Sequence, residues 1–242
     1  QKRLKPSDAS RKVIDTGFGE YIFVEETKYK VLTGVARLTK DGQSVSGDTF
    51  SMINLPSGEL LMALSDGMGS GTSAFDDSKN VIELLEQMSE AGFSQTSAIR
   101  LINSLYMSDQ EFENYATLDI SLINLYKGEC SFLKNGAVGT YVLNQGKMYC
   151  IEGQSLPMGV VSDAEPYIGK MSLYPGDYVI MMTDGVADMF SQERYNLEKF
   201  IKQIEIVNPG DMAQAIVDEA VSRNKGAVSD DMSVIVAGVW EN

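Results

Sequence analysis

Four aspartates, each at the end of a predicted strand, are the residues of this sequence best suited to chemistry. Asp66 and Asp184 each end an apolar run and precede a glycine, and Asp48 and Asp230 each precede an apolar run. Carboxylate oxygens are the ligands that Mg²⁺ and Mn²⁺ prefer in proteins. Four of them would nearly neutralise two divalent ions, and a two-metal site suits hydrolysis of a phosphate ester by activated water. An Asp-Gly pair also forms tight turns, so Asp66 taken alone is equally compatible with a simple turn.

The composition excludes most other catalytic chemistry. The sequence has no histidine, which rules out Ser-His-Asp or Cys-His catalysis and any zinc site with histidine ligands. Cys130 and Cys150 cannot form a zinc site alone, and we interpret them as free core thiols in a reducing, cytoplasmic environment. Thr72 stands where a dinucleotide-binding loop beginning at Gly67 would need a third glycine, and no Gly-Lys-Ser/Thr ends a phosphate-binding loop.

The charge of the chain argues against some classes of partner. The formal net charge is −14, so nucleic acid is not an expected partner, because binding it requires a basic face. The acidic excess is compatible with cation binding, although a solvated surface is its usual meaning. No apolar run approaches the roughly 18 residues that would span a membrane. We therefore expect no membrane contact from this chain, although its parent could be anchored through a segment before Gln1.

The elements around the aspartates are predicted to bring them together. Residues 49–55 and 60–65 read as a β-hairpin around a turn at 56–59. If Leu55 faces Leu60, Asp48 falls opposite Gly67 and beside Asp66. Residues 178–183 and 233–239 read as two further strands, and an antiparallel pairing would place Asp184 and Asp230 at one end as well. The sequence thus predicts two pairs of carboxylates at the edges of sheets.

The remainder of the chain predicts an α+β fold. Apolar periodicity indicates helices at about 74–91, 96–107, 191–204 and 211–224, with Asp211 capping the last. Asp76 and Asp77 are interpreted as surface residues in the first turn of the first helix, where the helix dipole favours acids. Short hairpins elsewhere favour antiparallel sheets flanked by helix pairs. We expect one domain over 16–242, preceded at 1–15 by a linker or a frayed segment.

A family resemblance rests on four motifs in a fixed order. The chain resembles the PPM (PP2C-type) metal-dependent protein serine/threonine phosphatases in these motifs: Ser-Gly-Asp48, Ser-Asp66-Gly67-Met-Gly, Thr-Asp184-Gly185 and Asp230-Asp-Met-Ser. The resemblance covers about residues 20–240. The Ser-Asp-Gly-Met-Gly-Ser-Gly form is similar to the stage II sporulation phosphatases of endospore-forming bacteria. It implies a four-layer αββα sandwich over 16–242 that hydrolyses phosphoserine on a small protein of anti-anti-sigma type.

The resemblance also assigns roles at the site. It implies two Mn²⁺ or Mg²⁺ ions, with Asp66 as the catalytic residue that bridges both. The Gly67 carbonyl and Asp48 would serve one ion, and Asp184 and Asp230 the other. Residues 74–107, the helices after Gly71, would form a regulatory switch between partner binding and metal occupancy, and their exposed face could pair two copies into a homodimer.

Two departures from the family leave alternatives open. Met68 stands where many animal members have a histidine, so the general acid is unassigned and could be water. No motif matches the phosphate-binding arginine of animal members, and Arg37 is the candidate for that role. A non-catalytic phosphoprotein-binding module on the same fold is the main alternative function, and a structural cation-binding domain is the third.

Overall fold

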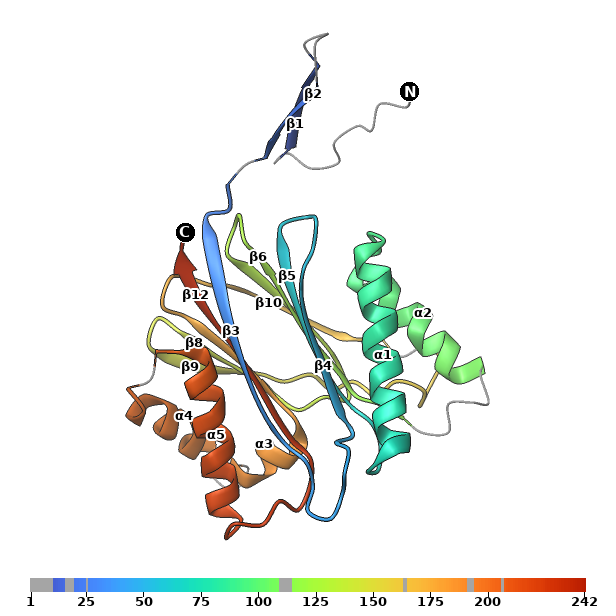
Figure 1. Cartoon of the computed structure of the whole chain (residues 1–242), viewed down its shortest axis with the longest axis vertical. Coiled ribbons are helices and arrows are strands. Elements are labelled where there is room, and N and C mark those ends of the chain that lie inside the picture. The colour runs from blue at the N-terminus through green and yellow to red at the C-terminus, as the bar shows by residue number, and fades with distance from the viewer. Residues whose placement is uncertain are drawn as a thin grey trace.

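A computed structural model of the chain describes residues 11–15, 20–24, 26–108, 115–162, 165–190, 194–205 and 207–242. Its body is a sandwich of two five-stranded sheets in which every pairing of neighbouring strands is antiparallel (Figure 1). The first sheet has the order β10 (Tyr167–Ser172), β7 (Glu129–Asn135), β6 (Leu118–Asn124), β5 (Glu59–Asp66) and β4 (Asp48–Asn54). The second has the order β3 (Tyr29–Leu38), β12 (Met232–Glu241), β11 (Tyr178–Met182), β8 (Thr140–Asn144) and β9 (Lys147–Ile151).

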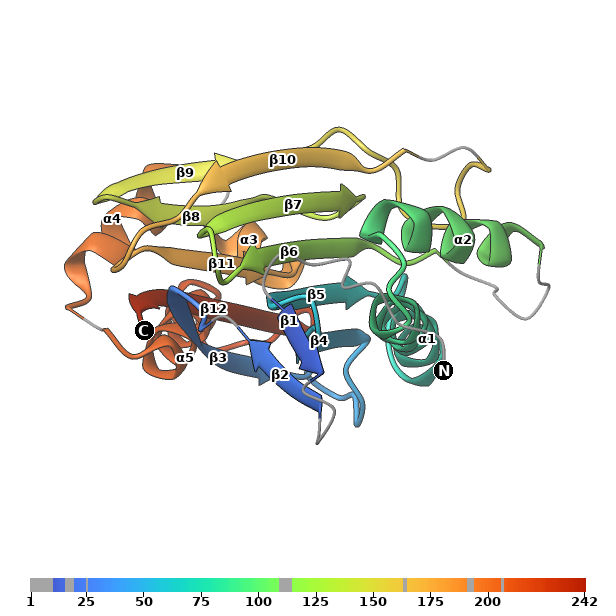
Figure 2. The same cartoon turned by 90° about the horizontal axis from the view of Figure 1, so that it is seen from above.

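Helices cover the outer face of each sheet, so the predicted α+β sandwich is confirmed (Figures 1 and 2). The first sheet carries α1 (Thr72–Glu90) and α2 (Gln95–Ser108), and the second carries α3 (Asp184–Phe190), α4 (Arg194–Gln203) and α5 (Pro209–Arg223). Within the described residues the second face therefore has three helices where the sequence predicted a pair. The helix expected over 191–204 is present as α4, and the short helix α3 before it was not predicted.

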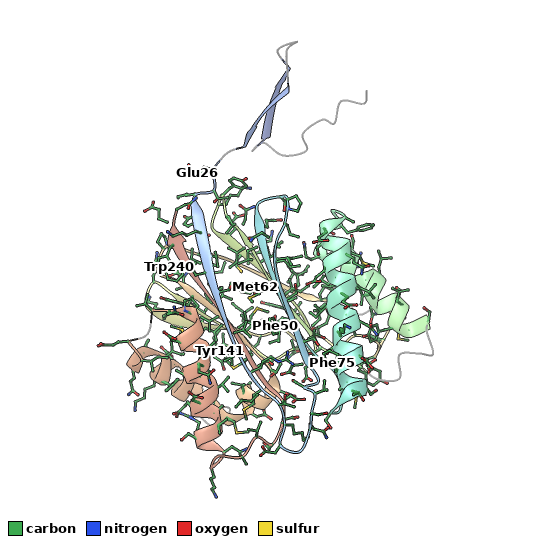
Figure 3. The ribbon with its side chains drawn as sticks, in the orientation of Figure 1. Glu26, Phe50, Met62, Phe75, Tyr141 and Trp240 are labelled. Atoms are coloured by element: carbon green, nitrogen blue, oxygen red, sulfur yellow. The ribbon has the colours of Figure 1, made fainter. Side chains whose placement is uncertain are left out.

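Three apolar clusters hold the layers together, and they explain the unbroken apolar runs of the central strands. On β5, Leu61 and Ala63 face α1 and α2, whereas Met62 and Leu64 face the second sheet. Figure 3 shows Met62, together with Phe50 of the neighbouring strand, in the middle of the molecule. Because both faces of β5 are buried, no position between its ends faces water. Each large side chain buried in this way stabilises the fold by about 1.5–3 kcal/mol.

The β4–β5 hairpin sets the position of two of the candidate ligands. Its register pairs Asp48 directly with Asp66 and Asn54 with Leu60. The expected pairing of Asp48 with Gly67 was therefore wrong by one residue. The turn is shorter than predicted, because Gly58, at φ +80°, donates its N–H to the Leu55 carbonyl and leaves a three-residue loop.

Two local expectations need correction. The cap of α5 is Asn208, whose side chain accepts hydrogen bonds from Gly210 N and Asp211 N, so Asp211 lies inside the first turn. Asp77 is buried rather than on the surface, and its backbone carbonyl accepts a hydrogen bond from the Tyr106 hydroxyl.

The expected linker at 1–15 contains a strand. β1 (Arg11–Asp15) pairs with β2 (Glu20–Val24), and Figure 1 shows this hairpin beyond one end of the sandwich. Residues 1–10 and 16–19 lie outside the described part of the chain. Within the described residues, no helix has the length and apolar character needed to cross a membrane.

Candidate metal centre

The four predicted aspartates are brought to one end of the sandwich by strands of both sheets. Asp48 begins β4 and Asp66 ends β5 in the first sheet. Asp184 follows β11 and opens α3, and Asp230 lies just before β12, the antiparallel neighbour of β11. Thr183 joins the two pairs, because its hydroxyl donates a hydrogen bond across the sandwich to Asp48 Oδ2 at 3.0 Å. The prediction that each pair lies at one edge of a sheet is confirmed, and the structure in addition brings the two pairs together.

Asp66 lies at the electrostatic centre of this group. Burial, followed by the charges of Asp48, Asp184 and Asp230, raises the pKa of Asp66 to about 9. In this form the Asp66 carboxyl donates a hydrogen bond to the Asp184 carboxylate. No basic side chain of the described residues forms an ion pair with Asp66. Because Asp66 holds a proton at neutral pH when no cation is present, a cation bound beside it would stabilise its ionised form.

Asp48 is the most deeply buried of the four, with 1% of its surface exposed. Its Oδ2 accepts the Thr183 hydrogen bond, but its Oδ1 has no hydrogen-bond partner among the described residues. Burial is the main cause that raises the pKa of Asp48 to about 6, and the charge of Asp231 adds to it. A buried carboxylate oxygen without a partner is costly, so this atom is placed to accept an ion or a water molecule.

These residues fit a pair of hard divalent cations. All candidate ligands are oxygens, one buried oxygen lacks a partner, and the group carries more negative charge than the chain itself neutralises. Lys40 offers the one described ion pair to the four aspartates, at 3.6 Å from Asp230, and both side chains are substantially exposed. Within the described residues no three acidic or thiol side chains are arranged as a ready-made metal cage. Ion binding would therefore require the carboxylates to turn about their side-chain bonds.

The glycines that follow Asp66 and Asp184 are required by the close approach of other backbone atoms. A Cβ on Gly67 would lie 1.9 Å from the carbonyl oxygen of Ala74, so α1 can begin this close to the site only because residue 67 is glycine. A Cβ on Gly185 would lie 2.1 Å from the carbonyl oxygen of Asp231, where α3 meets the start of β12. The repeated Asp-Gly is thus more than a turn signal, because in both places it lets two backbone segments approach closely beside one of the aspartates.

Sequence reasoning missed a residue that holds the site in place. Asp231 is buried, and its carboxylate accepts hydrogen bonds from Gly47 N at 2.7 Å and from Lys40 N at 2.9 Å. It therefore ties the loop before Asp48 to the start of β12. The signal was the second aspartate in Asp230-Asp231, which was quoted as part of a motif but given no role of its own.

The structure also gives the positions of the other four residues that the sequence singled out. Arg37 lies beside the site, where its Nη2 donates to the Asp48 carbonyl at 3.0 Å and its guanidinium stacks on Phe50. Met68 is exposed. Cys130 is fully buried in the core between the sheets, and burial raises the pKa of its thiol, which agrees with a core thiol rather than a nucleophile. Cys150, on β9, is only half-buried.

Solved structures share this architecture. The PP2C phosphatase domain of SpoIIE from Bacillus subtilis, solved with a fragment of its regulatory domain, superposes with a TM-score of 0.83 at 30% identity, over 92% of this chain and 66% of that one. The catalytic domain of the serine/threonine protein phosphatase PstP, in complex with two manganese ions, superposes with a TM-score of 0.71 over 88% of this chain and 100% of that one. At 18% identity, this second likeness concerns the fold alone. The fold and the acidic edge of the sandwich define a PP2C-type phosphatase domain.

Sequence comparison identifies the family of this chain within the PP2C-type phosphatases. The family described as Stage II sporulation protein E (SpoIIE) matches residues 56–240, and this chain belongs to that family. Stage II sporulation protein E of Bacillus subtilis (strain 168) is 32% identical over 229 residues, which is 93% of this chain. The chain spans 28% of the length of that relative.

Proposed function

We propose that this chain is a metal-dependent protein serine phosphatase. It removes phosphate from phosphoserine on a regulatory protein of anti-anti-sigma type through a water molecule activated at a two-metal site. The observation that carries the proposal is the uncompensated acidic group around Asp66, in a chain that shares its fold with the PP2C phosphatase domain of SpoIIE from Bacillus subtilis. PstP, a neighbour in fold, is in complex with two manganese ions, which supports the choice of cation.

The chain's own residues would divide the work as follows. Asp66 would bridge two ions, the Gly67 carbonyl and Asp48 would hold one of them, and Asp184 and Asp230 would hold the other. Bound divalent ions neutralise phosphate oxygens and lower the pKa of a coordinated water, which makes hydroxide available near neutral pH. The Thr183 hydroxyl keeps Asp48 oriented by donating to Oδ2. The Gly47 N–H held by Asp231 fixes the backbone from which Asp48 projects.

The helices α1 and α2 suit a regulatory role at this site. Helix α1 packs against Gly67 through the Ala74 carbonyl, so a shift of α1 would move a proposed ligand directly. The outer face of α2 exposes Leu101, Leu105 and Met107. These contacts support the proposal that residues 74–107 couple partner binding, or pairing of two copies, to metal occupancy.

Hydrolysis of p-nitrophenyl phosphate tests the activity. Turnover should require Mn²⁺ or Mg²⁺, stop in EDTA and stop in Asp66→Ala, whose circular dichroism should match that of the wild type. A phosphoserine-carrying anti-anti-sigma protein should then lose its phosphate under the same conditions. A chain that binds Mn²⁺ but hydrolyses neither substrate would be a binding module or a structural cation-binding domain, and the proposal would be wrong.

A further inference from the structure

A buried ion pair lies beside the candidate metal centre, and neither of its residues is one of the proposed metal ligands. Asp119 on β6 and Lys134 on β7 face each other in register, with Lys134 Nζ 2.7 Å from Asp119 Oδ2. Both side chains are almost completely buried, at 2% and 0% exposed. Taking two such charges out of water is costly, so a pair at this depth requires an explanation beyond surface solvation.

The hydrogen bonds of Lys134 are complete. Its ammonium group donates to Asp119 Oδ2, to Thr140 Oγ1 at 2.8 Å and to the Val138 carbonyl at 2.6 Å. An ammonium group has three donors, so all of them are used. Thr140 begins β8 of the second sheet, and Val138 lies just before it. Lys134 therefore links the two sheets and fixes the segment around Val138.

The hydrogen bonds of Asp119 are incomplete. Its Oδ2 accepts from Lys134 and from the Thr140 hydroxyl, the latter at 2.6 Å. Its Oδ1 is buried and accepts no hydrogen bond from any described residue. The ion pair therefore neutralises the carboxylate and holds it still, while leaving one oxygen with free lone pairs.

That oxygen belongs to a residue that lines a cavity shared with the candidate metal centre. The cavity has a volume of about 30 Å³, and its walls include Asp119, Asp66, Asp184, Thr117 and Val138. A space of this size holds one or two water molecules, and it offers the several polar partners that a buried water needs. Asp119 pairs in register with Leu64, two positions before Asp66 on β5, so the two carboxylates project from the same face of the sheet.

We propose that Asp119 is a positioning residue of this site. Its free Oδ1 accepts a hydrogen bond from a water molecule in the cavity beside Asp66 and Asp184, and so orients the water that attacks phosphorus. Lys134 and Thr140 hold the other oxygen, which keeps the carboxylate fixed when its water is consumed and replaced. The role in attack rests on the proposed phosphatase function, whereas the presence of the water does not.

A purely structural role is the alternative, in which the pair merely joins the two sheets. The double variant Asp119→Asn/Lys134→Gln separates the two, because it removes both charges at once and leaves no buried charge unpaired. We expect the melting temperature of this variant to stay within a few degrees of the wild type and its KM for p-nitrophenyl phosphate to stay within about threefold. Its kcat should fall by about 10- to 100-fold, as found for outer-shell residues of metal sites. A kcat within twofold of the wild type would overturn the proposal.

Asp177 supplies a matched control at the other end of β11. It is also a buried carboxylate, which accepts hydrogen bonds from Asn144 Nδ2 and from the backbone N–H groups of Tyr174 and Gln145. Asp177→Asn should lower the melting temperature and leave kcat within twofold. If the double variant at 119 and 134 does not fold, Thr140→Val answers the same question with both charges kept. A kcat lowered by about threefold or more with unchanged KM would support the proposal, and an unchanged kcat would overturn it.

A crystal structure of the complete 242-residue chain gives a readout that does not depend on activity. It should show an ordered water within about 3 Å of Asp119 Oδ1. A dry cavity, or a side chain filling it, would overturn the proposal. A wild-type chain without any turnover would refute the phosphatase function, and this structure alone would then decide whether Asp119 holds a water.

Discussion

Asp66 and Asp119 lie on neighbouring strands of one sheet and line one cavity, yet among the described residues only Asp119 has a basic partner. Asp119 has Lys134 at 2.7 Å and a hydroxyl donor beside it. Asp66 has three other aspartates nearby, and its pKa rises to about 9. The chain thus supplies its own cation to one buried carboxylate and, within the described residues, supplies none to the other. The difference indicates where a cation from solution is expected, and it leads to three predictions.

The largest effect is expected from removing one acid of the uncompensated group. Asp184→Asn keeps the size of the side chain but removes a charge that the two ions would need. Hydrolysis of p-nitrophenyl phosphate should fall below detection, while circular dichroism should show an intact fold. Turnover retained at even a tenth of the wild-type rate would contradict the two-metal mechanism.

A large loss of stability is expected from removing the cation of the compensated pair. Lys134→Met leaves Asp119 buried without its partner, and breaking a buried pair in this way costs about 3–5 kcal/mol. Urea denaturation should show this decrease in the free energy of unfolding. The matched comparison is Lys202→Met, which removes an exposed lysine that pairs with Glu198 and should cost less than about 0.5 kcal/mol.

The smallest effect is expected to have the opposite sign. Asp66 holds a proton in the folded metal-free chain at pH 8 but is ionised in the unfolded chain, so folding requires the uptake of a proton, and Asp66→Asn removes that cost. The free energy of unfolding in EDTA at pH 8 should rise by at least about 1 kcal/mol, since one unit of pKa corresponds to about 1.4 kcal/mol, and the gain should disappear below about pH 4, where both states hold the proton. A decrease would mean that Asp66 supports the fold, and the contrast with Asp119 would no longer hold.

The sequence allowed the acidic group of the site to be predicted because its signals are local. An apolar run that ends in Asp-Gly marks a buried strand and its end, and pairing each such run with the strand that follows an Asp sufficed to expect two carboxylate pairs, each at one edge of a sheet. The register of the β4–β5 hairpin was missed by one residue because it depends on the positive φ of Gly58, which sets the length of the turn. Helix α3 was missed because its seven residues are too few to show an apolar period.

The Asp119–Lys134 pair shows where local reasoning ends. A charged residue inside the apolar strand at 118–124 was a visible signal, because a buried charge needs a partner. Its partner could not be read from the sequence, since the pairing depends on the register between β6 and β7. The orphaned Oδ1 depends in addition on Thr140, which arrives from the other sheet. Contacts of this kind become visible only when the two sheets are packed together.

Titration of Mn²⁺ into the metal-free wild-type chain, followed by isothermal calorimetry, tests the central contrast most directly. We expect saturable binding of about two ions per chain. We also expect Asp66→Asn to weaken this binding greatly and Asp177→Asn to leave it unchanged. Absence of Mn²⁺ binding to the wild type, or equal binding by Asp66→Asn, would show that the uncompensated carboxylates are not a metal centre.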